Sequence, residues 1–256
     1  MVHFVGAGPG AEDLITVRGA ALIRKADQII YAGSLVNPDL FREKKVSCAV
    51  YDSSRMTLEE VLQLMESGEQ DGKMTVRLHT GDPCIYGAIR EQMDALDRLG
   101  IPYDYVPGVS SFCGAAAALN LEYTLPGVTQ SVILTRAAGR TEVPERESIR
   151  SFAVHGATMV LFLSAGLVRD VCRELLEGGY RGDTPAAVVK RASWPDEEAY
   201  VCTVATLAET CERHGITKTA LLIVGEAAGR AGGERSRLYD PSFSTGYRKG
   251  EESREG

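Results

Sequence analysis

Short apolar runs alternate with amphipathic stretches along the first half of the chain. Four runs read as buried strands: 2–5, 28–31, 75–78 and 103–106. Three stretches place apolar residues three or four positions apart and read as helices: 16–26, 57–66 and 91–99. Thr16 is the expected N-cap of the first helix, and Gly100 is expected to end the third. This alternation predicts an α/β fold with parallel strands.

The same pattern starts again after Pro126-Gly127. Strands are predicted at 130–135, 157–163, 186–189 and 220–224, with a helix at 167–176. The expected organisation is an N-terminal α/β domain (1–114), a linker (115–128), a C-terminal α/β domain (129–228) and a flexible tail (229–256). The tail is rich in Gly, Ser, Arg and Glu, a composition that is typical of segments without a core. We expect mostly parallel or mixed sheets in the two domains.

Composition and charge narrow the classes of partner. The chain has 256 residues, 44% of them hydrophobic, and a formal net charge of -7, which argues against general attraction to nucleic acid or anionic membranes. Its six cysteines form no Cys-x-x-Cys pair and no histidine cluster joins them, so we expect reduced thiols and no metal site. No signal peptide or bilayer-spanning run is recognised, so a cytoplasmic location is expected.

Two glycine turns follow predicted strands. Val5-Gly6-Ala7-Gly8-Pro9-Gly10 follows the first strand, and Thr80-Gly81-Asp82-Pro83 follows the third, within a longer run that ends at Tyr86-Gly87. Gly81 lets the backbone approach a ligand, Pro83 stiffens the turn, and Asp82 can bond to the turn or to a ligand. Open α/β sheets bind ligands at the carboxyl ends of their strands. Both turns are therefore candidates for a binding site.

A dinucleotide-binding turn is the main alternative for the first motif. Gly6, Gly8 and Ala11 satisfy the formal Gly-x-Gly-x-x-Gly/Ala spacing. However, no acidic residue follows the second predicted strand to hold a ribose, because Asp27 precedes that strand. A flavin or nicotinamide oxidoreductase therefore remains an alternative function with weaker support.

The pairing of the two glycine turns resembles the tetrapyrrole (corrin/porphyrin) methyltransferases. Further segments resemble the branch of this family that methylates carbon 11 of precorrin-4 or cobalt-precorrin-4 in cobalamin biosynthesis: 31–36, 107–112, 129–136, 139–145 and 192–197. The resemblance covers residues 1 to about 228. Ala137-Ala138 departs from it, since an acidic residue is common at the second position.

The resemblance implies two α/β domains with S-adenosylmethionine bound in the cleft between them, S-adenosylhomocysteine as product, and a homodimer. It implies cofactor contacts at these positions: Pro9, Thr80, Gly81, Asp82, Pro83, Ser111, Phe112, Ser164, Ala192, Val224 and Gly225. Whether the substrate already carries cobalt stays open, because such a metal would belong to the macrocycle.

An acidic tetrapyrrole requires cationic partners, and arginine meets carboxylate groups in a two-pronged geometry. The candidate substrate-binding residues are Arg55, Arg136, Arg140 and Arg191, with Arg77, His79 and Lys190 as further cations. A catalytic base is not identified, and His79, Asp82 and Tyr31 are the groups considered. The alternatives to the carbon-11 reaction are methylation of another tetrapyrrole and a non-catalytic carrier of tetrapyrrole intermediates.

Overall fold

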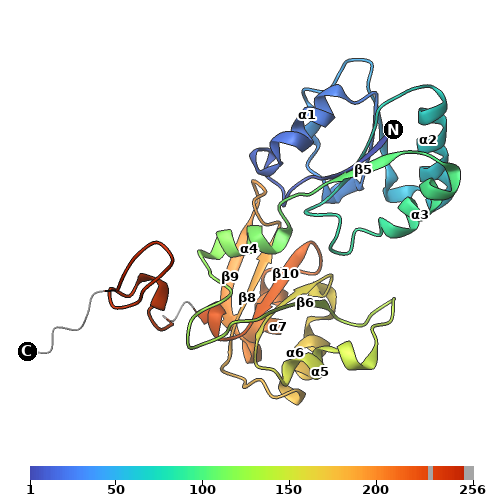
Figure 1. The fold of residues 1–256 in the computed structure, drawn as a ribbon. Helices are drawn as coiled ribbons and strands as arrows, with labels where there is room; N and C mark the ends of the chain where they lie inside the picture. Colours follow the sequence, from blue (N-terminus) through green and yellow to red (C-terminus); the bar gives the residue numbers. More distant parts are fainter. Residues whose placement is uncertain (230–232, 251–256) are drawn as a thin grey trace, which may run out of the picture. The chain divides into compact units, whose positions relative to one another are not determined.

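The structure is a computed structural model that describes residues 1–229 and 233–250 (Figure 1). The chain forms two compact units. The first comprises Met1–Ala118 together with Val189–Glu198, and the second comprises Leu119–Val188 and the chain from Ala199 onward. The segment 189–198, which the sequence-based division assigned to the C-terminal domain, is thus grouped with the first unit, although Val189, Lys190 and Glu198 also belong to strands of the second sheet. Residues 230–232 and 251–256 of the expected flexible tail lie outside the described residues.

The first unit is built on a parallel sheet with the strand order β3-β2-β4-β1-β5. Its strands are β1 (Val2–Gly6), β2 (Gln28–Tyr31), β3 (Ala49–Asp52), β4 (Thr75–His79) and β5 (Tyr103–Val106). In this order β1 lies between β4 and β5, so the loops that follow these three strands leave the same edge of the sheet. The predicted parallel sheet is confirmed, with β3 as a strand that the pattern had not shown.

The helices of this unit begin and end where local chemistry indicates. They are α1 (Val17–Lys25), α2 (Leu58–Gln70), α3 (Arg90–Leu99) and α4 (Ser111–Leu119). Thr16 caps α1 by accepting a hydrogen bond from the backbone N–H of Gly19 at 3.1 Å. Thr57 and Glu60 form a capping box at the start of α2, and Gly100 ends α3 in the left-handed conformation. Because α4 extends to Leu119, the first residues of the predicted linker are helical.

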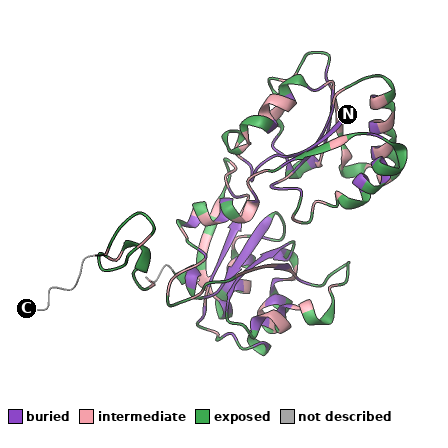
Figure 2. Cartoon of the chain, viewed as in Figure 1, coloured by how far each residue is buried: buried purple, intermediate pink, exposed green. Residues whose placement is uncertain are grey.

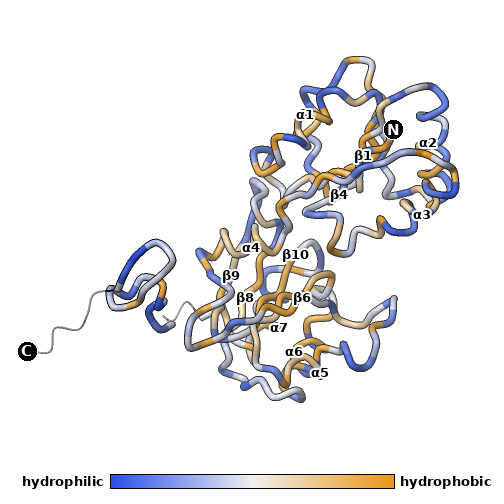
Figure 3. The backbone as a smooth tube through the Cα atoms, viewed as in Figure 1, coloured by the Kyte–Doolittle hydropathy of each residue, from blue (hydrophilic) through white to orange (hydrophobic). Residues whose placement is uncertain are grey.

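Alternating side chains of the central strands fill two cores, one on each face of the first sheet. Val5, Ile29 and Leu78 belong to one cluster, whereas Phe4 and Ile30 belong to the other. Burial of each such side chain contributes about 1.5–3 kcal/mol. Figure 3 shows hydrophobic colouring along β1 and β4. The sheet is therefore a rigid platform for the loops at its edge.

The second unit contains a mixed sheet with the order β6-β7-β10-β8-β9. Its strands are β6 (Val132–Arg136), β7 (Thr158–Phe162), β8 (Pro185–Lys190), β9 (Glu198–Thr203) and β10 (Ala220–Val224), and its helices are α5 (Ile149–Ala153), α6 (Val168–Glu177) and α7 (Val204–Arg213). β7 runs parallel to β6 and antiparallel to β10. Met159, Leu161, Leu175 and Leu207 are fully buried in its core, and Figure 2 shows burial concentrated along the central strands. The described part of the chain contains no helix with both the length and the apolar surface that crossing a bilayer requires.

Candidate functional site

Three glycine-containing loops meet at the carboxyl edge of the first sheet. The backbone N–H of Gly81 donates to the carbonyl oxygen of Gly8 at 2.8 Å. In return, the N–H of Gly8 donates to the carbonyl oxygen of Gly81 at 3.2 Å. A Cβ atom on Gly6 would lie 2.6 Å from the Cα atom of Gly108, and one on Gly108 would lie 2.3 Å from the carbonyl oxygen of Gly81. Only glycine allows backbones to approach so closely. The two motifs that were found separately in the sequence thus form one junction.

The Asp82 carboxylate stabilises this junction by accepting hydrogen bonds from the loops that form it. Its Oδ2 atom accepts a hydrogen bond from the N–H of Gly108, and its Oδ1 atom accepts one from the N–H of Cys84, both at 2.8 Å. The Tyr105 hydroxyl also donates to Oδ1. Burial raises the pKa of Asp82, but these donors outweigh it and leave that pKa below its usual value. An ionised carboxylate with three donors is a weak base, so the geometry favours a structural role over the catalytic one considered above.

Four of the predicted cofactor contacts gather around the first turns of α4. A Cβ atom on Gly81 would lie 3.3 Å from the backbone nitrogen of Ser111. A Cβ atom on Gly114 would lie 2.8 Å from the Cβ atom of Pro9 and 3.4 Å from that of Ala192. Pro9, Gly81, Ser111 and Ala192 are distant in the sequence, yet the first unit brings them together.

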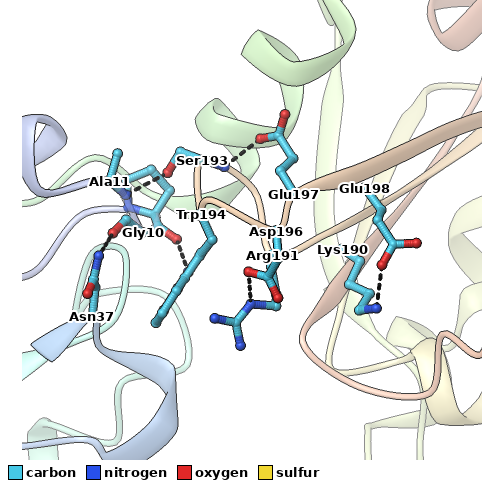
Figure 4. Close-up of polar contacts among 11 residues, drawn as sticks. Gly10, Ala11, Asn37, Lys190, Arg191, Ser193, Trp194, Asp196, Glu197 and Glu198 are labelled. Atoms are coloured by element: carbon cyan, nitrogen blue, oxygen red, sulfur yellow. Dashed lines mark hydrogen bonds and ion pairs between the residues drawn. The ribbon is translucent and has the colours of Figure 1, made fainter.

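Trp194 holds the first glycine loop in place, as Figure 4 shows. Its Nε1 atom donates to the carbonyl oxygen of Pro9 at 3.1 Å, and the Ser193 hydroxyl accepts from the N–H of Ala11 at 3.0 Å. Asn37 donates from Nδ2 to the carbonyl oxygen of Gly10 at 2.9 Å. Our sequence reasoning did not include Trp194, Ser193 or Asn37 among the site residues, because no spacing rule connects them with the glycine loop.

The Arg191 guanidinium is occupied by contacts within the same segment. It donates from Nε to Asp196 Oδ1 at 2.6 Å, and its central carbon lies 4.0 Å from the centre of the Trp194 ring. Arg191 and Ser193 have φ angles of 51° and 63°, in the left-handed region that is costly for residues with a side chain. Lys190 likewise pairs with Glu198 at 2.5 Å. Arg191 therefore shapes the 189–198 segment rather than presenting a bare cation.

In the second unit, Arg136 and Ser164 also make internal contacts. The Arg136 guanidinium donates to the carbonyl oxygens of Ala137, Thr141 and Glu142 at 3.2, 3.1 and 2.7 Å. The buried Ser164 hydroxyl donates to the carbonyl oxygen of Phe162 at 2.7 Å and accepts from the N–H of Ala137 at 2.8 Å. Arg136 thus ties down the loop after β6, and Ser164 joins the ends of β6 and β7.

The register of the second sheet separates the remaining cofactor candidates. Arg136 pairs with Phe162 at the end of β7, next to Ser164. Val224 pairs with Met159 near the start of β7, and its side chain is fully buried. A Cβ atom on Gly225 would lie 3.1 Å from the Cα atom of Thr158. Val224 and Gly225 therefore lie at the opposite end of β7 from Ser164. This separation argues against one cofactor contacting all three residues.

The three groups considered as a catalytic base have different surroundings. The Tyr31 ring packs against Phe41, with 5.2 Å between the ring centres, and Asp82 is fully engaged as described above. His79 is buried on β4, and burial, followed by the charge of Arg77, lowers its pKa to about 3. Its ring is therefore neutral near pH 7. Arg55 ends a 3-10 helix (Ser53–Arg55) and Arg140 lies on a loop; both are exposed, and neither forms a salt bridge within the described residues.

The first loop differs from a dinucleotide-binding turn. After β1 the chain forms a short 3-10 helix at Glu12–Leu14, and α1 starts only at Val17, so Ala11 precedes the helix instead of packing within it. Asp27 pairs with Lys45 at 2.7 Å and accepts a hydrogen bond from the N–H of Met74 at 2.9 Å. It is thus committed to other contacts, which argues further against the oxidoreductase alternative.

Comparison with known proteins identifies relatives over nearly the whole length of the chain. The family described as Tetrapyrrole (Corrin/Porphyrin) Methylases matches residues 1–208. A protein of Methanocaldococcus jannaschii named cobalt-precorrin-4 C(11)-methyltransferase is 50% identical over 248 residues, which cover 97% of this chain and 96% of the relative. A Mycobacterium tuberculosis relative named precorrin-4 C(11)-methyltransferase is 43% identical, covering 93% of this chain and 95% of the relative.

Solved structures give the same result. The X-ray structure of a cobalt precorrin-4 methyltransferase matches with a TM-score of 0.87 and 46% identity, covering 89% of this chain and 95% of that one. A Thermus thermophilus uroporphyrin-III C-methyltransferase in complex with S-adenosylhomocysteine matches with a TM-score of 0.74 and 27% identity, covering 90% and 99%. The family match and these identities over nearly the full length lead to one conclusion: the chain belongs to the tetrapyrrole (corrin/porphyrin) methylase family.

Proposed function

We propose that this protein transfers the methyl group of S-adenosylmethionine to carbon 11 of precorrin-4 or cobalt-precorrin-4, a step of cobalamin biosynthesis. The names of the relatives support this reaction, and the matches extend over nearly the whole chain. The structural observation that carries the proposal is the junction of Gly6, Gly81 and Gly108 at the carboxyl edge of the first sheet. Such an edge is where α/β proteins bind nucleoside-containing ligands.

The residues at this junction suit the methyl donor. Glycine and other small residues leave backbone N–H and carbonyl groups open to an adenosine or amino acid moiety. The proposed cofactor contacts in the first unit are Pro9, Thr80, Gly81, Pro83, Ser111, Phe112 and Ala192, with Asp82 supporting the loop through its own hydrogen bonds. Ser164 remains a candidate contact from the second unit.

The donor supplies a sulfonium methyl group that is already activated for attack by an electron-rich ring carbon. The task of the protein is therefore to align that carbon with the methyl group and to exclude water. Hydrogen bonds of Asp82 and Trp194 within the protein hold the two glycine loops in place. We propose that this preformed arrangement, rather than a covalent intermediate, provides most of the rate acceleration.

Exposed arginines are the proposed first contacts of the acidic substrate. Arg55 and Arg140 carry charges that no salt bridge compensates within the described residues. Arg136 and Arg191 shape their loops through the contacts described above, and we propose that they act on the substrate through loop position. Arginines of this kind can bind the carboxylate groups of an acidic macrocycle in a two-pronged geometry.

Mass spectrometry of parallel reactions tests this function. The protein is incubated with methyl-labelled S-adenosylmethionine and either precorrin-4 or cobalt-precorrin-4, and the product is fragmented to locate the label. We expect one labelled methyl group at carbon 11, and the faster substrate shows whether cobalt is required. Label at another carbon would contradict the carbon-11 assignment, and binding of both ligands without any transfer would indicate a carrier.

We further propose that the enzyme is a homodimer, as the resemblance to its family implies, and that it works in the cytoplasm, as expected from the sequence pattern. Sedimentation equilibrium at micromolar concentration tests the assembly. A mass of twice 27.6 kDa is expected, and a single-chain mass would contradict the dimer.

A further inference from the structure

A pocket of about 290 Å³ opens in the first unit beside the glycine junction. Arg77, His79 and Thr80 line it from β4 and the loop that follows. The rest of its wall comes from Ala32 and Leu35 after β2, from residues between 53 and 61 before and within the first turn of α2, and from residues between 85 and 92. The pocket therefore lies at the same carboxyl edge as the proposed donor site, but on the β2 side of β4.

Arg77 places a buried positive charge in this wall. Only 7% of its surface is exposed, and it donates from Nε to Gln92 Oε1 at 3.1 Å and from Nη1 to the carbonyl oxygen of Ile30 at 3.2 Å. No carboxylate forms a salt bridge with it within the described part of the chain. Burial lowers the pKa of Arg77 to about 10, which still leaves it charged at neutral pH. A buried charge is costly unless an opposite charge compensates it.

His79 adds a buried polar atom without a partner. The residue is 5% exposed, and its Nε2 atom has no hydrogen-bond partner among the described residues. Its ring stacks against Phe4 with 6.2 Å between the centres, which fixes its orientation. A neutral imidazole carries one N–H and can donate it. Buried polar atoms in native proteins are normally satisfied, so this one calls for a ligand atom.

The loop over the pocket is strained. Tyr86 and Ala88 have φ angles of 56° and 49°, which residues with side chains seldom adopt. Gln92 links the loop to the charge, because its Nε2 atom donates to the carbonyl oxygen of Ala88 at 3.0 Å while its Oε1 atom accepts from Arg77. The Gln92 side chain thus forms hydrogen bonds to both the strained loop and the buried Arg77 guanidinium.

We propose that this pocket is a carboxylate-binding subsite, in which the Arg77 guanidinium and the Nε2–H group of His79 hold one carboxylate. The proposal rests on the proposed function for the source of that group, an acetate or propionate side chain of the tetrapyrrole. Its carboxylate supplies the charge that Arg77 lacks and the acceptor that His79 lacks. Glu91, the one acid in the lining, is exposed to solvent, where water screens its charge.

A titration of the wild-type protein tests the subsite directly. The histidines are labelled with ¹⁵N, and the His79 signals are assigned by comparison with His79→Gln. Acetate and propionate are added at constant ionic strength, with acetamide and propionamide as uncharged controls of the same shape. We expect a saturable shift of His79 Nε2 with the two carboxylates and at least about tenfold weaker binding of the amides. No saturable shift, or equal binding of acids and amides, would overturn the proposal.

Gln92→Glu then tests the role of the Arg77 charge, because it places a carboxylate beside the guanidinium while keeping the acceptor at this position. We expect it to weaken acetate binding and to raise the KM for the tetrapyrrole by about tenfold, with unchanged affinity for S-adenosylhomocysteine. Gln63→Glu adds the same charge at an exposed position of α2 and should change none of these values. Unchanged acetate binding in Gln92→Glu would show that the charge is not used.

Two controls make the result specific. The carboxylate introduced by Gln92→Glu cannot donate to the carbonyl oxygen of Ala88, so the variant also releases the loop. Gln92→Leu, which removes the same loop contact without adding a charge, should therefore lose clearly less acetate affinity than Gln92→Glu. An equal loss in Gln92→Leu and Gln92→Glu would assign the effect to the loop and overturn the role of Arg77. The titration needs neither methyl donor nor tetrapyrrole, so it can fail while methyl transfer succeeds, and the reverse.

Discussion

Single residues determine how closely the backbones meet at the candidate site. Gly6 and Gly108 leave no space for a Cβ atom. Gly81 has a φ angle of +58°, and a Cβ atom added to it would lie 3.3 Å from Ser111 N. His79 and Asp82 show a second effect at the same scale. Burial keeps His79 neutral, while hydrogen bonds keep Asp82 ionised in spite of burial. The space beside each glycine therefore decides how closely the backbones approach, and the number of hydrogen-bond donors decides whether a buried side chain is charged.

Gly81→Ala should weaken binding of S-adenosylhomocysteine by about tenfold or more, because the new Cβ atom narrows the space beside Ser111. Gly72→Ala is the matched control, since Gly72 has a φ angle of +67° but no atom within 4 Å of an added Cβ. Both variants should lose about 1–2 kcal/mol of stability from the left-handed backbone. Calorimetric titration and thermal melts measure the two effects, and equal affinities would remove this loop from the cofactor site.

His79 should make the free energy of unfolding depend on pH between about 6.5 and 3. The unfolded chain protonates this residue near its ordinary pKa of 6.5, whereas the folded protein does not protonate it until about pH 3. Its contribution is complete above pH 6.5 and is lost as pH falls, with a slope approaching about 1.4 kcal/mol per pH unit. Urea denaturation of wild type and His79→Gln between pH 7.5 and 5 tests this. The variant should show the shallower dependence, and parallel curves would contradict the assignment.

Elements distant in the sequence stabilise one another in the first unit. The 189–198 segment holds the loop after β1 through Trp194 and Ser193, while Asn37 holds the same loop from the other side (Figure 4). The loop after β4 is held in turn by the loop after β5, through Asp82 and Gly108. Each glycine loop therefore depends on an element that the local sequence does not contain.

Gly10 and Trp194 should be energetically coupled, because a Cβ atom on Gly10 would lie 2.1 Å from Trp194 Cδ1. We expect Gly10→Ala to destabilise the wild type by about 1–3 kcal/mol through overpacking, and to cost clearly less in a Trp194→Ala background. Denaturation of the two single variants and the double variant gives the coupling energy. Additive losses would show that the ring can move away freely. Trp194→Phe, which keeps an aromatic ring but not the N–H donor to Pro9, separates packing from hydrogen bonding.

The whole molecule combines two units with different sheets, one fully parallel and one mixed. The first contains the glycine junction, the pocket beside it and the 189–198 segment. Local stability can differ between units of this kind, so unfolding need not be a single transition. A ligand of the glycine junction should therefore act first on the unit that contains it.

S-Adenosylhomocysteine at one hundred times its Kd should add about 2.7 kcal/mol to the stability of the unit that binds it. For a chain of this size that corresponds to an increase in Tm of about 5–11 °C. Differential scanning calorimetry with increasing ligand measures the shift, and adenine at the same concentration is the control. A ligand-independent Tm would contradict binding to the folded protein.

Local patterns in the sequence were sufficient for most elements of the fold. Strands β5 and β10 have the predicted bounds, Thr16 and Thr57 cap the predicted helices, and Gly100 ends the third. The pattern did not show β3 or β9, two edge strands whose side chains are half-buried or exposed. Apolar periodicity reports burial, so weakly buried edge strands give little signal.

The sequence by itself determined the α/β alternation, the two glycine turns and the family resemblance, because each depends on residues that are neighbours along the chain. Only the tertiary structure decided three other properties. Trp194 forms a hydrogen bond to the first glycine loop, the Asp82 carboxylate accepts hydrogen bonds within the protein, and Arg77 is buried without a salt bridge to a carboxylate in the described part of the chain. These properties depend on which distant segments pack together. Burial, pKa and hydrogen-bond satisfaction are set by that packing, and no local spacing encodes them.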